Sequence, residues 1–223
     1  MIAFEKVFLY FLIYSFIGWI MEEVYVGIEL KKIVNRGFLI GPICPIYGIG
    51  FLLLYFLIKT SNPILVFLES IVICSILEYS TSYILEKVFN ARWWDYSKEK
   101  FNLNGRICAK TMIPFGIIGT IFLCIVQPRV QVIINYFNPM ILSITSLILG
   151  ILFISDVILS FKIMHNIGKK IKFAKIDNTE EIKDEVSKWL LSKSFIYRRI
   201  KKAYPNYKIR MKKMRNNIKE ALS

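Results

Sequence analysis

The feature that most constrains this chain is a series of five apolar runs, each about 20 residues long. A helix of about 20 residues crosses a hydrocarbon layer of about 30 Å. Lipid offers no partner to an unpaired amide, so the backbone in such runs must be helical. The sequence therefore predicts an all-α, polytopic membrane helix bundle. Its spans are expected near residues 4–26, 38–58, 64–86, 107–127 and 137–161.

Basic residues are distributed unevenly between the connections of these runs. The segment from Lys169 onward holds 17 Lys and Arg against six Asp and Glu. The connections and the C-terminal segment on one side of the predicted spans carry 25 basic residues, and the N-terminus and connections on the other side carry three. Because Lys and Arg are enriched in cytoplasmic loops, we expect the N-terminus outside and the C-terminus in the cytoplasm. This orientation requires an odd number of spans, and five agrees with it.

The same asymmetry divides the chain into a transmembrane domain, residues 1–165, and a basic cytoplasmic tail, residues 166–223. Residues 177–181 are typical of a helix start, because capping side chains are followed by acids that suit the positive end of a helix dipole. Near an anionic leaflet each Lys or Arg contributes on the order of 1 kcal/mol to binding. We expect a helical tail that binds anionic lipid headgroups. No nucleic-acid partner is expected, since no nucleic-acid motif accompanies the charge.

Two connections depart from simple turns. Residues 35–48 hold two prolines and three glycines, so no regular helix is expected before about Pro45. This segment either enters the membrane irregularly under a cover of protein or water, or forms an ordinary loop just below it. Residues 89–106 are too aromatic for a free linker and too charged to span. An aromatic belt at the headgroups explains the tryptophans of this connection but not Asp95 and Arg106.

Ionisable side chains inside apolar runs are costly and therefore point to a functional or structural role. Glu22 and Glu78 each share a helical stripe with small or hydroxyl residues, which is typical of a close-packed polar interface. If the stripes face each other, both acids approach the same inner region as the arginines of the connections. Two interpretations stay open: a cytoplasm-facing polar cavity that binds a solute, and a structural carboxylate–arginine network. Asp156 is interpreted as part of a helix contact. The stripes are Ser15, Gly18 and Glu22, and Ser75, Glu78 and Ser82; the candidate cavity or network is Glu22, Arg36, Tyr47, Glu78, Asp95 and Arg106.

Several chemistries are not indicated by any motif. The sequence has no GxxxxGK[ST], so the chain cannot itself hold ATP in a P-loop, and it has neither HExxH nor GxSxG. Its four cysteines form no CxxC and its single histidine stands alone, so we expect no metal and no other cofactor. No catalytic residue is predicted.

Four blocks of sequence resemble a known family. They are Phe-x-Ile-Tyr-Ser-Phe-Ile-Gly-Trp-x-x-Glu (11–22), Asn-Arg-Gly-Phe-Leu-x-Gly-Pro-x-Cys-Pro-Ile-Tyr-Gly (35–48), Leu-Glu-Tyr-x-Thr-Ser (77–82), and Trp-Trp-Asp-Tyr-Ser (93–97) followed by Phe-Asn-Leu-Asn-Gly-Arg-Ile (101–107). Together they resemble the type IV ABC-transporter permease family, small polytopic proteins of mainly Gram-positive bacteria. The resemblance covers roughly residues 8–125 and leaves out the fifth span and the tail. It implies a bacterial plasma-membrane protein, and the positions matching the family's pattern are Glu22, Arg36, Gly41, Pro42, Pro45, Tyr47, Glu78, Trp94, Asp95, Tyr96, Asn102, Gly105 and Arg106.

The resulting prediction is a membrane-spanning, permease-like subunit of a transporter. An ABC-type transporter would need a separate ATPase subunit, for which the connection 89–106 and the tail are the natural cytoplasmic docking surfaces. Five spans are few for a translocation path, so we also expect a homo-oligomer or a second membrane partner. Two alternatives stay open: a non-transporting scaffold or regulatory protein whose tail binds lipid or a partner, and a membrane-embedded enzyme acting on lipid. The predicted docking loop consists of Trp93, Trp94, Asp95, Tyr96 and Asn102.

Overall fold

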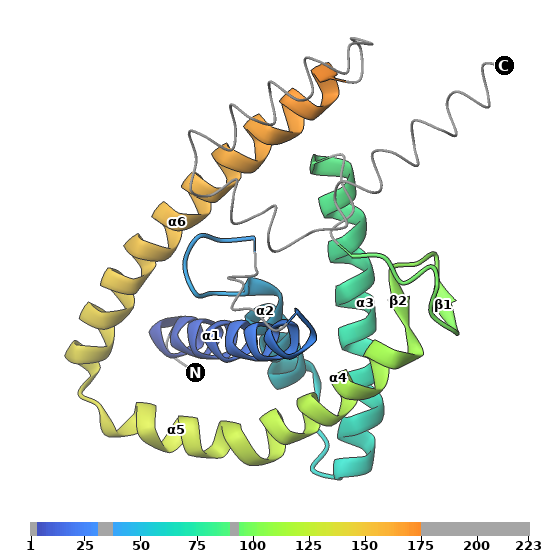
Figure 1. The fold of residues 1–223 in the computed structure, drawn as a ribbon. Coiled ribbons are helices and arrows are strands. Elements are labelled where there is room, and N and C mark those ends of the chain that lie inside the picture. Colours follow the sequence, from blue (N-terminus) through green and yellow to red (C-terminus); the bar gives the residue numbers. More distant parts are fainter. Residues whose placement is uncertain (1–3, 31–37, 90–93, 175–223) are drawn as a thin grey trace, which may run out of the picture.

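The computed structural model describes residues 4–30, 38–89 and 94–174, which are almost entirely helical (Figure 1). The predicted all-α class is confirmed. The one sheet in these ranges is a short antiparallel hairpin inserted between two helices. In chain order the elements are α1 (Phe4–Leu30), α2 (Pro45–Leu57), α3 (Pro63–Phe89), β1 (Asn102–Leu103), β2 (Ile107–Cys108), α4 (Ala109–Ile121), the π-helix η1 (Phe122–Val126), α5 (Gln127–Tyr136) and α6 (Pro139–Ala174).

Four helical stretches are long and apolar enough to cross a membrane, namely Phe4–Tyr25, Pro63–Val88, Ala109–Tyr136 and Pro139–Lys162. Helix α2 has 13 residues, which gives a length of about 20 Å and leaves it short of a hydrocarbon layer. The second predicted span is therefore helical only from Pro45, and residues 38–42 form bends instead. The total of five crossings stays a prediction. The predicted tail begins within α6, and its residues 175–223 lie outside the described residues.

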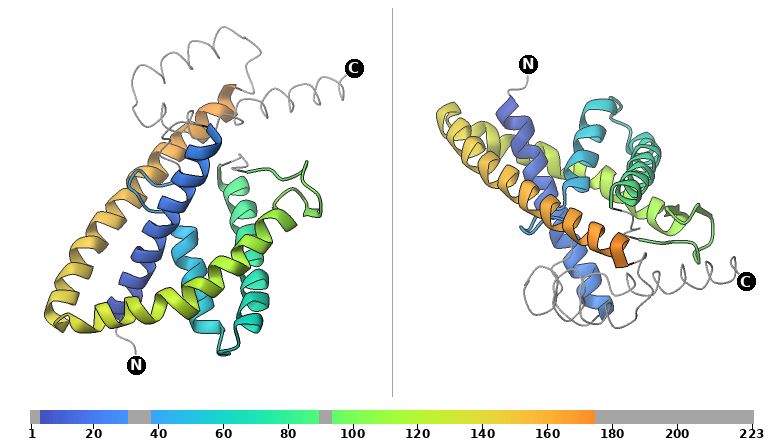
Figure 2. Two further views of the ribbon diagram at one scale, coloured as in Figure 1. Left: turned by 60° about the horizontal axis from the view of Figure 1, so that its bottom comes forward. Right: turned by 90° about the horizontal axis from the view of Figure 1, so that it is seen from above.

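Successive apolar helices run in alternating directions through the bundle (Figure 2). The C-terminal ends of α1 and α6 lie at the same end of the molecule as the β1–β2 hairpin. The N-terminus, the α2–α3 connection and the corner between α5 and α6 lie at the opposite end. Helix α3 packs mainly along α4, and α1 packs mainly along α2. Helix α6 contacts α1 and, more weakly, α3.

The fourth predicted span is longer than expected, because α4, η1 and α5 form one continuous stretch of 28 residues. Residues 128–136 were expected to connect two spans, and they are helical instead. Pro128 has no N–H to offer to the carbonyl four residues earlier. The Gln127 N–H bonds to the Phe122 carbonyl five residues back, which defines the π-turn. The widened turn lets the helix continue past the proline.

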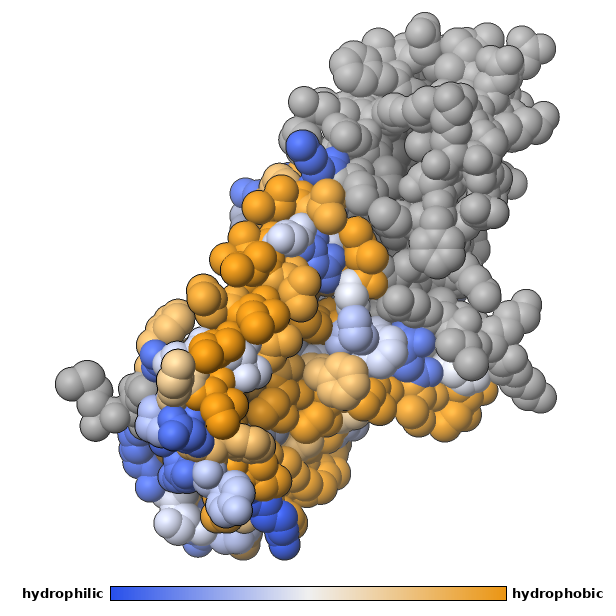
Figure 3. Space-filling model, turned by 90° about the vertical axis from the view of Figure 1, so that its left-hand side faces the viewer, coloured by the Kyte–Doolittle hydropathy of each residue, from blue (hydrophilic) through white to orange (hydrophobic). Residues whose placement is uncertain are grey.

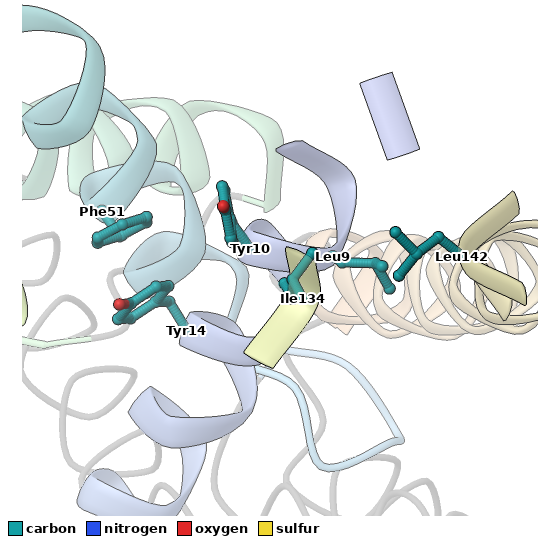
Figure 4. Packing of buried hydrophobic residues seen from close by; sticks show 6 residues of the cluster. All are labelled: Leu9, Tyr10, Tyr14, Phe51, Ile134 and Leu142. Carbon is teal, nitrogen blue, oxygen red and sulfur yellow. The ribbon is translucent and has the colours of Figure 1, made fainter. Parts of the chain in front are cut away.

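The core lies where α1 and α2 meet the α4–α5 helix and the start of α6, and it is rich in aromatic rings (Figure 4). The rings of Tyr14 and Phe51 stack with centroids 3.5 Å apart. The Tyr14 hydroxyl donates to Gln127 Oε1 at 3.0 Å, so this polar group is satisfied inside the apolar core. Figure 3 shows that the face of the bundle lined by α6 is largely hydrophobic, as lipid contact requires. The buried cluster consists of Leu9, Tyr10, Tyr14, Phe51, Ile134 and Leu142.

Candidate functional site

The connection between α3 and α4 folds into a hairpin. The Arg106 N–H donates to the Leu103 carbonyl at 3.0 Å and closes a four-residue turn. The central residues of this turn, Asn104 and Gly105, have φ values of 53° and 65°, as a type I′ turn requires. A Cβ at Gly105 would also fall against the side chain of Ser97. Glycine is therefore needed there for both backbone conformation and space, and the connection has one defined shape.

Arg106 fixes the base of this hairpin to α3. Its Nη2 lies 2.8 Å from Glu86 Oε2, and its Nη1 donates to Ser82 Oγ at 3.2 Å. Its guanidinium carbon lies 5.7 Å and 5.3 Å from the ring centroids of Tyr79 and Tyr83, which is close enough for cation–π attraction. The side chain is buried, so an ion pair here is screened less than one on an exposed surface. These contacts attach the hairpin to the last two turns of α3.

Glu78 forms a second attachment, one helical turn deeper in α3. Its Oε1 accepts from the Tyr96 hydroxyl at 3.1 Å, and its Oε2 accepts from the Thr111 hydroxyl at 3.3 Å. Tyr96 belongs to the hairpin connection and Thr111 to the first turn of α4. Burial, and then the charge of Glu78, raise the pKa of the Tyr96 hydroxyl. Tyr96 therefore remains a hydrogen-bond donor throughout the physiological pH range.

Glu22 lies in the same neighbourhood but is bound differently. Its Oε1 accepts from the Tyr47 hydroxyl of α2 at 2.8 Å, and its charge contributes a smaller part of the raised pKa of Tyr96. The stripe of α1 that carries Glu22 faces α2, since Gly18 lies against the Tyr47 ring and Gly48 lies against α1. Whether the two polar stripes face each other stays a prediction. The small residues of this α1 stripe allow α2 to pack closely against α1.

The segment before α2 is covered by protein on two sides. The Cys44 N–H donates to the Ser15 carbonyl of α1 at 3.0 Å. The Ile40 and Gly41 N–H groups donate to Asp156 Oδ1 and Oδ2 of α6 at 2.9 Å and 2.8 Å. The irregular backbone of this segment is thus covered by protein, and its depth in the membrane stays a prediction. Asp156 was interpreted only as part of a helix contact, although an acid near the centre of an apolar run was a signal of a larger role.

The predicted docking loop divides into residues that support the hairpin and residues that it exposes. Trp94 Nε1 donates to the Arg106 carbonyl at 2.9 Å, and Asn102 Nδ2 donates to the Glu99 carbonyl at 2.8 Å. Asp95 accepts from the Ser97 N–H at 3.1 Å and so stabilises a local turn. Arg36, Arg92 and Trp93 lie outside the described residues.

The apolar residues that the hairpin exposes are Phe101 and Leu103, whose relative exposures are 87% and 55%. Neither residue was among the predicted site residues. The sequence did hold a signal of this exposed surface. Phe101 and Leu103 are apolar residues in a polar loop, and neither has the side-chain N–H or O–H by which a tryptophan or tyrosine suits the headgroup region.

Metal binding has no support in the described part of the chain, where no three His, Cys, Asp or Glu gather closely enough to hold an ion. The four cysteines form no disulfide.

Comparison with known families gives a match over residues 9–161 to a family described as "Putative ABC-transporter type IV". The match covers more than half of the chain and includes most of the apolar part of α6. It corrects the expectation that the last span lies outside the family. Neither the comparison with curated proteins nor that with solved structures gives a match.

Proposed function

This chain belongs to the type IV ABC-transporter family, and we propose that it is the permease-like membrane subunit of a transporter whose ATP is hydrolysed by a separate subunit. Its apolar helices make it a membrane protein. The chain has no P-loop motif, so an ATP-driven mechanism requires a second polypeptide. We further propose that the hairpin end of the bundle faces the cytoplasm, where ATP is available.

The observation that carries this proposal is the exposed, well-anchored tip of the hairpin. Phe101 and Leu103 project from it, and Lys98 and Lys100 flank them. Apolar side chains on a rigid, charged loop are typical of the centre of a protein interface, because little ordering entropy is lost on binding. This tip is therefore a suitable docking point for a soluble subunit.

The anchors of the hairpin give docking a mechanical consequence. Arg106 connects the hairpin to Glu86 on α3, and Tyr96 connects it to Glu78 on the same helix. The hairpin continues directly into α4, which packs along α3. A force applied by an ATPase at the tip would therefore be transmitted to the α3–α4 pair as a unit, since packed elements move together rather than deforming continuously.

The experiment is a pull-down of the tagged full-length protein from its native host in a mild detergent, followed by mass spectrometry and an ATP hydrolysis assay. We expect a stoichiometric P-loop ATPase with the wild type. The double variant Phe101→Ser/Leu103→Ser should lose most of it while eluting as a monodisperse protein. The control is Tyr136→Ser/Met140→Ser, which replaces two side chains of 91% and 71% exposure at the opposite end of the bundle. Equal recovery with both double variants would contradict the docking surface.

A second function is favoured by a specific observation: Trp94 and Asn102 form structural hydrogen bonds within the connection, and Arg106 binds it to Ser82 of α3. A loop stabilised in this way also suits a scaffold or regulatory subunit that transports nothing. Recovery of a stoichiometric partner without a P-loop, lost in the Phe101→Ser/Leu103→Ser variant, would favour this function over the permease.

A further inference from the structure

Glu78 is a buried carboxylate with no basic partner among the described residues. Its relative exposure is 5%, and it lies within the apolar stretch Pro63–Val88. The nearest described arginine along the hairpin, Arg106, is engaged by Glu86 and Ser82 instead. A carboxylate in such surroundings is neutralised either by a cation or by a proton, because an isolated buried charge is very costly. Among the described residues no cation contacts it.

The groups that surround Glu78 come from several elements and do not supply a positive charge. Thr111 on α4 and Tyr96 on the connection contact it directly through their hydroxyls. Cys74 on its own helix and Glu22 on α1 interact with it electrostatically. Negative charge on Glu22 disfavours a second negative charge at Glu78. Tyr47 on α2 bonds to Glu22 and so belongs to the same group.

Thr111 allows Glu78 to be hydrogen-bonded in both protonation states. Its hydroxyl lies 3.3 Å from Glu78 Oε2 and 3.0 Å from the Cys108 carbonyl. A hydroxyl has one hydrogen and two lone pairs, so it can donate to either group and accept from the other. With Glu78 ionised, Thr111 donates to Oε2. With Glu78 protonated on Oε2, the acid O–H donates a hydrogen bond to the Thr111 hydroxyl oxygen, and the Thr111 hydroxyl donates to the Cys108 carbonyl.

We propose that the Glu78–Tyr96–Thr111 junction is a proton-binding site of the membrane domain, and that its proton controls how firmly the hairpin is held. Binding adds one proton to Oε2 and breaks no covalent bond. Tyr96 donates to Oε1 in both states, but a hydrogen bond to an ionised acceptor is stronger than one to a neutral acid. Loss of the proton therefore tightens the attachment of the hairpin to α3. Proton binding is independent of transport, and only its effect on a docked ATPase rests on the proposed function.

The test is infrared difference spectroscopy of the purified full-length protein in lipid, titrated between about pH 5 and pH 9, a range that includes known buried carboxylates. We expect the C=O stretching band of a protonated carboxylic acid to appear with falling pH. It should be lost in Glu78→Gln and retained in Glu99→Gln, which changes a carboxylate of the same hairpin region that is paired with Lys110. Tyr96→Phe should keep the band but move it to higher wavenumber, because the C=O group loses its donor.

Two outcomes would overturn the proposal. One is a Glu78-dependent band that is absent, or constant, over the whole range. The other is a titrating band with an unchanged frequency in Tyr96→Phe, which would show that the acid is not bonded to the hairpin. Neither measurement involves an ATPase, so failure of the docking proposal leaves this result unaffected. Should Glu78→Gln not yield folded protein, Tyr96→Phe and Thr111→Val still decide the question, since each should move the same band.

Discussion

Replacing Asp156 by alanine should loosen the segment that precedes α2. Asp156 accepts from the Ile40 and Gly41 N–H groups at 2.9 Å and 2.8 Å. The Ile40 N–H also lies 3.1 Å from Ser160 Oγ and keeps that acceptor. The Gly41 N–H has no other acceptor in the described structure. The Ser160 hydroxyl also donates to Asp156 Oδ1, at 3.0 Å. The substitution therefore removes three hydrogen bonds to a charged group, two of them from the segment, and leaves the partly buried Gly41 N–H unsatisfied.

The magnitude follows from these contacts. A hydrogen bond to a charged group contributes about 1.5–3 kcal/mol, and an unsatisfied buried donor costs about 1–3 kcal/mol. Removal of the partly buried carboxylate returns some of this, because its own desolvation is relieved. We expect a net loss of about 2–4 kcal/mol of unfolding free energy for Asp156→Ala. For a chain of this size that corresponds to a fall in Tm of roughly 4–16 °C.

Two measurements check this prediction in detergent-solubilised protein: thermal unfolding by circular dichroism, and the rate at which a thiol reagent labels Cys44. Cys44 follows the segment directly, so its labelling rate should rise when Asp156 is lost, while that of the exposed Cys124 should not change. Ser155→Ala is the matched control, because it removes an exposed hydroxyl from the neighbouring position of α6. A Tm within about 1 °C of wild type together with an unchanged Cys44 rate would refute the reasoning.

Two further predictions concern packing and the hairpin. Gly48→Ala should destabilise the protein, since a Cβ there would collide with Ser15 and the backbone of α1. Gly150→Ala should be neutral or stabilising, because its Cβ would make only an ordinary contact at 3.8 Å. The Tm values of the two variants check this prediction, and equal values would be inconsistent with close α1–α2 packing. Arg106→Lys should not restore a stable hairpin, because a single ammonium cannot contact both Glu86 and Ser82 in the geometry of a guanidinium. Limited proteolysis at the hairpin should be several-fold faster in Arg106→Lys than in Lys98→Arg, and equal rates would argue against the Arg106 anchor.

The helices could be predicted from the apolar runs, because run length and the cost of unpaired amides in lipid leave little choice. The same argument failed at two places where proline intervenes. The fourth span was predicted to end at residue 127, yet a π-turn precedes Pro128 and the helix continues past it. Pro45 was correctly expected to start a helix, but the preceding residues lack helical hydrogen bonds and make α2 too short to span alone. Local sequence shows where a donor is missing but not how the surroundings compensate.

The candidate site was only partly accessible to sequence reasoning. The cost of a buried charge singled out Glu78, and the structure gives it two hydroxyl partners. The partner of Arg106 is Glu86, which lay at the end of a predicted span and so attracted no attention. Asp156 was underestimated because its partners are backbone groups 115 and 116 residues away, and backbone N–H groups carry no sequence signature. Whether the six-residue candidate group acts as a solute cavity stays a prediction.

The position of the segment before α2 has a consequence for how the protein is inserted during synthesis. This segment obtains its acceptors from α1 and from α6, the first and the last helices of the bundle to leave the ribosome. Until Asp156 has been translated, the Ile40 and Gly41 N–H groups have only water as a partner, and hydrocarbon does not supply it. The second apolar run should therefore remain at the membrane surface in any chain that stops before α6. We therefore expect a truncated product that lacks α6 to be degraded faster than the full-length chain.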